Sequence, residues 1–172
     1  LDEDRDEGQS EHRAPGAYDP SLRLADLDKE GIWAEAIYPS LGMWAFNIRT
    51  PEIAKLGCQA SNDFFIDFQN LSPERYVVAA SIPLLDIDDT VAEVNRAADM
   101  GFKLAFFPVK PPADRPDWHY DEWHPLWAVL EETGIVLGFH IGTEPVDPTG
   151  RIGRYYRGPG GAVLNYVETT YG

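Results

Sequence analysis

The chain has 172 residues, of which 44% are apolar and 12% aromatic, so it is long enough and apolar enough to form one domain around a hydrophobic core. Aspartate and glutamate number 29 against 14 lysines and arginines, which gives a formal net charge of -15. Phosphate backbones and anionic lipids repel so acidic a chain, and we therefore disfavour a nucleic-acid-binding or membrane-surface protein.

The first segment of the chain is acidic and polar, contains Pro15, Gly16 and Pro20, and shows no periodicity. We predict that residues 1–20 are a flexible acidic lead-in to one domain over residues 21–172. This segment lacks the cationic-then-apolar pattern of a signal peptide, and no stretch approaches the roughly 18 apolar residues of a membrane span. A single cysteine rules out an internal disulfide and favours a cytoplasmic protein.

Four short apolar runs then alternate with amphipathic segments of helical period. Thr50 and Asp121 are predicted to cap two of the helices, and Asp88 or Asp89 a third. The predicted strands are residues 32–38, 76–82, 102–107 and 135–141, and the predicted helices are residues 50–71, 88–100 and 121–133. Near-continuous apolar strands that alternate with helices are typical of a parallel sheet covered by helices.

The spacing of the strands suits successive βα units. No glycine-rich phosphate loop follows any strand, which disfavours a nucleotide-binding doubly wound sheet. A complete (β/α)₈ barrel needs about 250 residues, whereas this chain holds about four strands. We therefore predict an α/β fold that is part of a (β/α)₈ TIM-like barrel, with about four parallel strands and covering helices.

Two polar residues occupy positions that the pattern predicts to be inside an element. Cys58 lies in an apolar helical pattern, which favours a buried structural thiol over a nucleophile. The pattern consists of Ile53, Leu56, Ala60 and Phe64. Glu35 lies between apolar neighbours in the first strand and needs a polar partner, for which Lys103 is one candidate.

His140 is the candidate metal ligand. It ends the fourth apolar strand, and in such a barrel the active site lies at the carboxyl ends of the strands. Neutral imidazole is a common ligand for divalent metals, although position alone leaves a core histidine bonded to a backbone carbonyl as an equal alternative. His119 and His124 favour loop and surface roles. No two histidines have metal-motif spacing, so other ligands must come from elsewhere.

Three aromatic residues are candidates for binding the substrate. Trp44 and Phe46 lie in the loop after the first strand, and Phe107 lies at the end of the third. They are suited to wall a pocket for an aromatic substrate. For the two loop residues, packing against the following helix is an equal alternative.

Seven short motifs run in order along the chain, and together they are fairly specific. They are GIWAEAIYPS at 31–40, ASNDF at 60–64, SPERY at 72–76, IPLLD at 82–86, GFK at 101–103, DEWHPLW at 121–127 and FHIGT at 139–143. The set resembles the amidohydrolase-related family that includes aminocarboxymuconate semialdehyde decarboxylase and related aromatic-acid decarboxylases.

The resemblance implies a distorted (β/α)₈ barrel that binds a divalent metal ion, often zinc and in some members manganese. Its ligands would be a His-x-His or acid-x-His pair on the first strand, a histidine on the fifth and a late aspartate. His140 matches the fifth-strand histidine, and the other ligands are expected outside residues 1–172.

The implied function is that of a metal-dependent hydrolase or non-oxidative carboxy-lyase. Its substrate would be a small aromatic or unsaturated carboxylic acid, or an amide or ester, attacked through a metal-activated water. The alternative is a catalytically inactive barrel relative or fragment that serves as a binding or scaffold protein. The expected partner is a small-molecule substrate, with no nucleic acid and no membrane, and a homo-oligomer stays open.

Overall fold

The computed structural model describes residues 15–40, 42–112 and 114–140, and within them four parallel strands form one sheet. The strands are β1 (Glu35–Ile37), β2 (Tyr76–Ser81), β3 (Leu104–Pro108) and β4 (Val136–His140). They are hydrogen-bonded in the order β1-β2-β3-β4, so each strand lies beside the next one in the chain. This order and the parallel pairing confirm the predicted βα units.

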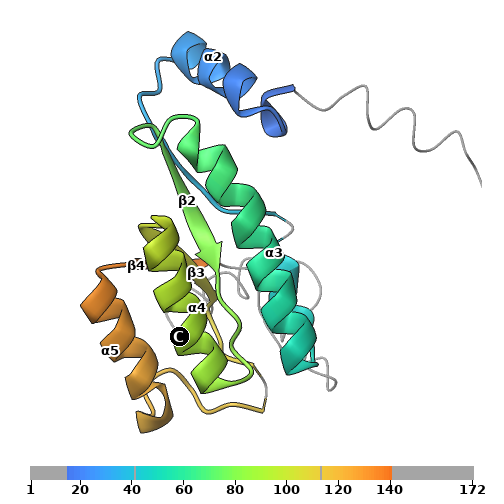
Figure 1. Cartoon of the computed structure of the whole chain (residues 1–172), viewed down its shortest axis with the longest axis vertical. Helices are drawn as coiled ribbons and strands as arrows, with labels where there is room; N and C mark the ends of the chain where they lie inside the picture. Colours follow the sequence, from blue (N-terminus) through green and yellow to red (C-terminus); the bar gives the residue numbers. More distant parts are fainter. Residues whose placement is uncertain (1–14, 41, 113, 141–172) are drawn as a thin grey trace, which may run out of the picture.

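Helices cover one face of this sheet. The helices are α2 (Pro20–Glu30), α3 (Pro51–Asn70), α4 (Ile87–Met100) and α5 (His124–Thr133), with 3-10 turns η1 (Pro15–Ala17), η2 (Gly42–Asn47) and η3 (Asp121–Trp123). Figure 1 shows α3, α4 and α5 in a row in front of the strands, with α2 at the far end of β2. The opposite face of the sheet is therefore free of α-helices in the part of the chain that the structure describes.

Two helix starts differ from the sequence prediction. Asp86 caps α4, because its carboxylate accepts hydrogen bonds from the backbone N–H groups of Asp88 and Asp89, which lie in the first turn. Asp121 does not cap α5, because residues 121–123 form the 3-10 turn η3 and the α-helix begins at His124. A proline in the first turn of α5 explains this later start, since proline suits the beginning of a helix.

Helix α2 was not predicted, and it begins inside the segment that we interpreted as a lead-in. Asp19 caps it by accepting hydrogen bonds from two backbone N–H groups, Pro20 is its first residue, and Gly31 ends it with a φ of 72°. These are ordinary signals for the start and the end of a helix. They were overlooked because the many charged residues in this part of the chain suggested a solvated segment. The hydroxyl of Tyr76 donates a 2.6 Å hydrogen bond to the backbone oxygen of Pro20, which ties α2 to β2.

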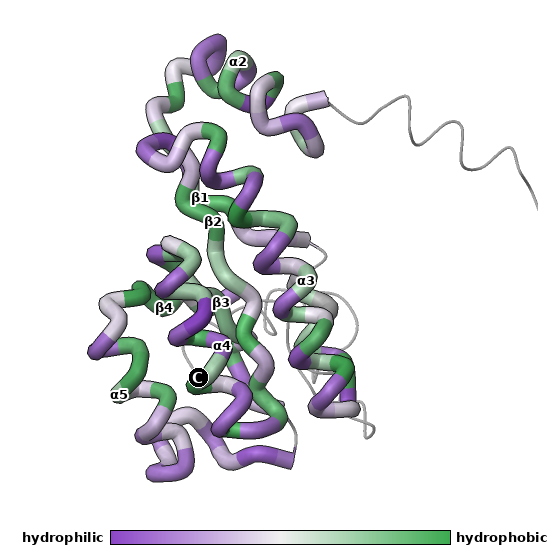
Figure 2. The backbone as a smooth tube through the Cα atoms, in the orientation of Figure 1, coloured by the Kyte–Doolittle hydropathy of each residue, from purple (hydrophilic) through white to green (hydrophobic). Residues whose placement is uncertain are grey.

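The main core covers both faces of the sheet, with Phe107 and Trp123 on the side of the helices and Phe46 and Phe106 on the opposite side. Its largest fully buried side chains are Trp123, Phe102, Phe106 and Phe107, and a smaller cluster joins Leu27 of α2 to Tyr76 of β2. Figure 2 shows the apolar character of the strands against the mixed character of the helices. No helix in residues 15–40, 42–112 or 114–140 is long and apolar enough to cross a membrane.

The first half of the buried face of α3 is made of small and polar residues, and Ile66 and Phe68 follow in its second half. Ala54, Cys58 and Asn62 are buried there, whereas the predicted apolar pattern is exposed. Its large members Ile53, Leu56 and Phe64 are 56%, 63% and 63% exposed. The prediction that Cys58 is buried is therefore confirmed, but the apolar pattern assigned to its side of the helix is wrong. Amide side chains on the inner face bond to the strand, which explains the difference.

Candidate functional site

His140 and Tyr38 meet at the carboxyl edge of the sheet. His140 is the last residue of β4 and pairs in register with Pro108 of β3, while Tyr38 directly follows β1. Their ring centroids lie 5.5 Å apart at an angle of 52°, and both side chains are half-buried. The carboxyl ends of parallel strands are where ligand sites form in βα folds.

The contact requires the sheet to be curled. β1 and β4 are separated by two strands, so a flat sheet would hold them about 14 Å apart. Instead, the phenol of Tyr38 packs edge-on to Phe106 of β3 and reaches the backbone of Gly138 in β4. The four strands therefore form a concave wall, as in half of a barrel, and Tyr38 crosses its inner face.

Phe46 lies on the same inner face as His140. Its ring packs edge-on to Phe106, with ring centroids 5.4 Å apart, so the structure brings Phe46, Tyr38, Phe106 and His140 together. Phe46 is buried. The backbone of Trp44 lies in η2 beside it, and the placement of the Trp44 side chain is outside what the structure describes. The inner face is thus walled by aromatic rings.

Phe107 lies on the other face of the sheet. Side chains alternate along a strand, so Phe107 points away from its neighbours Phe106 and Pro108. Its fully buried ring stacks on Trp118, with ring centroids 5.5 Å apart, in the layer of helices. The structure therefore does not bring Phe107 together with His140, and Phe107 lies outside the group of rings around His140.

The other described histidines lie on the surface. The His124 side chain is 69% exposed at the start of α5, with its Nε2 atom 3.5 Å from a carboxylate oxygen of Asp121. His119 is exposed in the loop before η3 and contacts the ring of Tyr120. Both positions agree with the predicted loop and surface roles.

Glu35 has a different partner from the one that we proposed. Its carboxylate accepts hydrogen bonds from the guanidinium of Arg23 in α2, and this pairing raises the pKa of Arg23. Lys103 is exposed at the start of β3, so the suggested contact between Glu35 and Lys103 is wrong. Arg23 could not be considered as a partner because α2 was not predicted.

His140 fits the role of one metal ligand, since its imidazole lies half-buried on the concave face at the sheet edge. Within residues 15–40, 42–112 and 114–140, no group of three or more histidine, cysteine, aspartate or glutamate side chains is placed to hold a metal ion. A complete metal shell around His140 would therefore need ligands from beyond the described residues.

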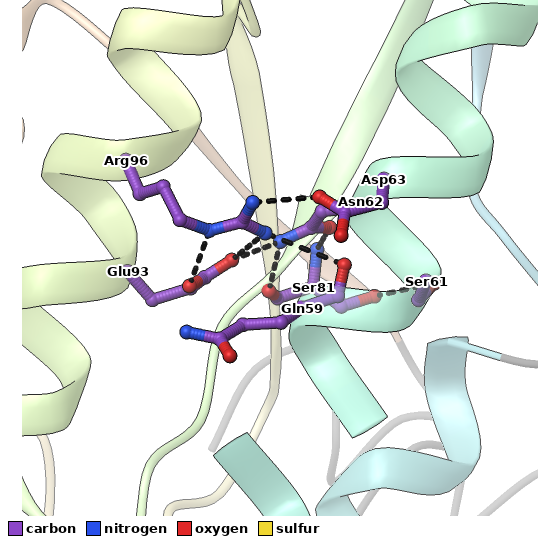
Figure 3. Close-up of polar contacts among 7 residues, drawn as sticks. All are labelled: Gln59, Ser61, Asn62, Asp63, Ser81, Glu93 and Arg96. Carbon is purple, nitrogen blue, oxygen red and sulfur yellow. Dashed lines mark hydrogen bonds and ion pairs between the residues drawn. The ribbon is translucent and has the colours of Figure 1, made fainter. Parts of the chain in front are cut away.

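A buried polar cluster fixes the end of β2 beside this site (Figure 3). The side-chain oxygen of Asn62 accepts a 2.8 Å hydrogen bond from the backbone N–H of Ser81, and its amide nitrogen donates to the backbone oxygen of Ser81 at 2.9 Å. The same nitrogen donates to Glu93 at 2.7 Å. Ser81 is the last residue of β2, so α3 and α4 together hold the strand end at the edge where His140 lies.

The carboxylate of Glu93 is buried and fully engaged. It accepts hydrogen bonds of 2.9 Å and 2.8 Å from the Nε and Nη2 atoms of Arg96, one turn further along α4. Arg96 also donates to the exposed Asp63 of α3 at 2.6 Å. Hydrogen bonding with Glu93 is the main reason why the pKa of Arg96 is raised. This cluster was not predicted, although a glutamate and an arginine three residues apart in a helix are placed to form an ion pair.

Cys58 is expected to behave as an inert thiol. Burial, and then the negative charge of Glu93, raise the pKa of Cys58 from 9.0 to about 12. The thiol of an unfolded chain ionises first, so unfolding becomes easier as the pH rises from 9.0 toward about 12. The free energy of unfolding should therefore fall more steeply above pH 9 in the wild type than in Cys58→Ala. Parallel slopes in the two proteins would contradict the raised pKa.

Comparisons with known proteins place this geometry in context. A family model described as amidohydrolase matches residues 33–162. The fold matches an amidohydrolase structure from Staphylococcus aureus with a TM-score of 0.66 and 20% identity, over 86% of this chain and 47% of that one. No curated protein matches the sequence.

Two decarboxylase structures share the fold as well. 5-Carboxyvanillate decarboxylase from Sphingomonas paucimobilis matches with a TM-score of 0.65 and 19% identity, over 87% of this chain and 44% of that one. The enzyme of the same name from Novosphingobium aromaticivorans, in complex with manganese and 4-hydroxy-3-methoxy-5-nitrobenzoic acid, matches with a TM-score of 0.62 and 23% identity, over 74% and 37%. The chain spans less than half of the length of each of these three structures.

Proposed function

Because the chain belongs to the amidohydrolase family, we propose that it is part of a metal-dependent enzyme that removes carboxylate from a small aromatic acid without oxidation. The observation that carries the proposal is the position of His140, whose imidazole lies on the concave face among aromatic rings. Support also comes from the neighbouring structures, two of which are decarboxylases of an aromatic acid.

In this proposal, His140 is one ligand of a divalent metal ion, and the remaining ligands come from residues that the structure does not describe. Such an ion supplies Lewis-acid chemistry and a site for activated water. A neighbouring structure contains manganese, which makes manganese the first metal to test, ahead of the zinc that the sequence resemblance favours. The ion would sit at the carboxyl edge of the sheet, where β4 ends.

The aromatic residues near His140 would restrict which substrates can bind. Tyr38 and Phe46 are proposed to contribute a flat apolar wall to the pocket, which suits a planar ring and leaves the carboxylate to face the metal. The overall reaction replaces the carboxylate on the ring carbon with a proton and releases carbon dioxide. Hydrolysis of an aryl amide or ester is the competing reaction that the family allows.

The test is a metal and product analysis of the full-length protein. We expect the purified protein to bind a divalent metal, with manganese and zinc compared, and to release carbon dioxide from a panel of hydroxylated benzoic acids that includes 5-carboxyvanillate. Aryl amides and esters form the second arm of the panel. Hydrolysis without carbon dioxide release would overturn the lyase assignment, and a protein that binds no metal would instead be a scaffold.

A further inference from the structure

Tyr38 makes a contact that the topology does not require. It follows β1, yet its ring touches His140 at the end of β4, three strands away in the sheet. On the way it packs edge-on to the fully buried Phe106, with ring centroids 5.9 Å apart at an angle of 78°. A buried ring on one side and an imidazole on the other restrict the orientation of the phenol.

Gly138 provides the space that this contact needs. A Cβ atom added at Gly138 would lie 2.5 Å from the phenolic oxygen of Tyr38 and 3.4 Å from the nearest ring carbons. The first distance is too short for any side chain, while the second is close to ordinary van der Waals contact. The glycine is therefore needed for the hydroxyl of Tyr38, and only marginally for its ring.

His140 benefits from such a neighbour because of its position. It is the last residue of β4, and in the described part of the chain β4 pairs with β3 alone. The rotation of an imidazole about its last side-chain torsion is broad, while a metal ligand must be held within roughly 10–20° of its productive orientation. A ring packed against the imidazole removes part of this freedom.

We propose that Tyr38 is a positioning residue that orients the imidazole of His140, and that Gly138 is the slot that admits its phenol. The inference rests on the proposed function only in treating His140 as a metal ligand. The contact of Tyr38 with His140 connects β1 to β4, two strands that are not paired with each other.

The first test measures metal binding by Tyr38 variants of the full-length protein. Tyr38→Leu should weaken manganese binding by about tenfold, the low end of the loss that follows when a ligand loses its supporting partner. Tyr38→Phe keeps the ring contact and should stay within about twofold of the wild type. The readouts are the Kd for manganese from electron paramagnetic resonance and the visible spectrum of the cobalt-substituted protein.

Phe102→Leu is the matched control, because it removes a buried ring just before the start of β3, away from the carboxyl edge of the sheet. It should lower the Tm by a similar amount to Tyr38→Leu and leave the manganese Kd and the cobalt spectrum unchanged. If the two variants weaken metal binding equally, or if Tyr38→Leu leaves the Kd unchanged, the positioning role is wrong.

The second test uses Gly138→Ala in two backgrounds. In the wild type, the new methyl group should displace the phenol from His140 and weaken manganese binding severalfold, because an added Cβ atom would lie 2.5 Å from the phenolic oxygen. In Tyr38→Phe the same substitution should have a smaller effect, since the clashing oxygen is gone. Equal effects of Gly138→Ala in both backgrounds would show that Gly138 is not needed to admit the phenol of Tyr38.

Failure of this inference differs visibly from failure of the proposed function. If the wild type binds no divalent metal, the proposed function fails and the Kd comparison cannot be made. If the wild type binds metal, and His140→Ala abolishes binding while every Tyr38 variant binds normally, then the proposed function stands and the positioning role is wrong.

Discussion

Replacement of His140 with alanine is expected to abolish metal binding and, with it, activity in the full-length protein. A lost ligand should cost more than the roughly 10–100-fold in affinity that follows the loss of an outer partner of a ligand. The fold should persist, because His140 is a half-buried residue at the end of a strand. Metal content after dialysis, catalytic rate and Tm are the three measurements.

His124→Ala is the control for this experiment. His124 is the same residue type, but its side chain is 69% exposed at the start of α5 and lies beside Asp121 rather than among the aromatic rings. It should keep the full metal content and rate. A His140→Ala protein that retains stoichiometric metal would remove the central support for the proposed enzyme.

Replacement of Arg96 with methionine is expected to produce the largest loss of stability. The variant leaves the carboxylate of Glu93 buried without its cation, which costs about 3–5 kcal/mol when one partner of a buried pair is removed. Arg96 is about one-third exposed, so the low end of this range is the better expectation. Urea denaturation of the wild type and the variant gives the difference in the free energy of unfolding.

Two further variants identify the cause of this loss. Asp63→Ala removes the exposed partner of the same arginine and should change stability by less than about 1 kcal/mol. The double variant Arg96→Met with Glu93→Gln should recover part of the loss, because the amide carries no charge and can still accept the hydrogen bond from Asn62. If the double variant is no more stable than Arg96→Met, the buried charge is not the source of the effect.

The parallel order of the strands could be predicted because short, near-continuous apolar runs alternate with segments of helical period. The same pattern could not fix the ends of the helices. Asp86 caps α4 although Asp88 and Asp89 are equally good caps by residue type, and only the backbone conformation decides among them. The spacing of apolar residues also predicted the wrong buried face for α3. Asn62 lies on the buried face and bonds to β2, whereas Phe64 is exposed.

Of the candidate site, the position of His140 followed from the end of its strand, because the carboxyl ends of parallel strands share one edge. The aromatic neighbours of His140 could not be predicted from the strand ends alone. Phe107 and Phe46 looked equivalent in sequence, but alternation along β3 turns Phe107 toward the helices. The contact of Tyr38 with Gly138 depends on how strongly the sheet curls, which no local pattern encodes.

The bonds made by Asn62 bear on which residues of the aromatic wall can be substituted. Two of the hydrogen bonds that define the end of β2 come from a helix, not from the loop segment Gly42–Asn47. Within that segment, Gly42 lies against the hydroxyl of Ser81, and Phe46 packs on Phe106 in the core. If Phe46 lines the proposed pocket, a substitution there would change the shape of the aromatic wall while the bonds from Asn62 still hold the end of β2.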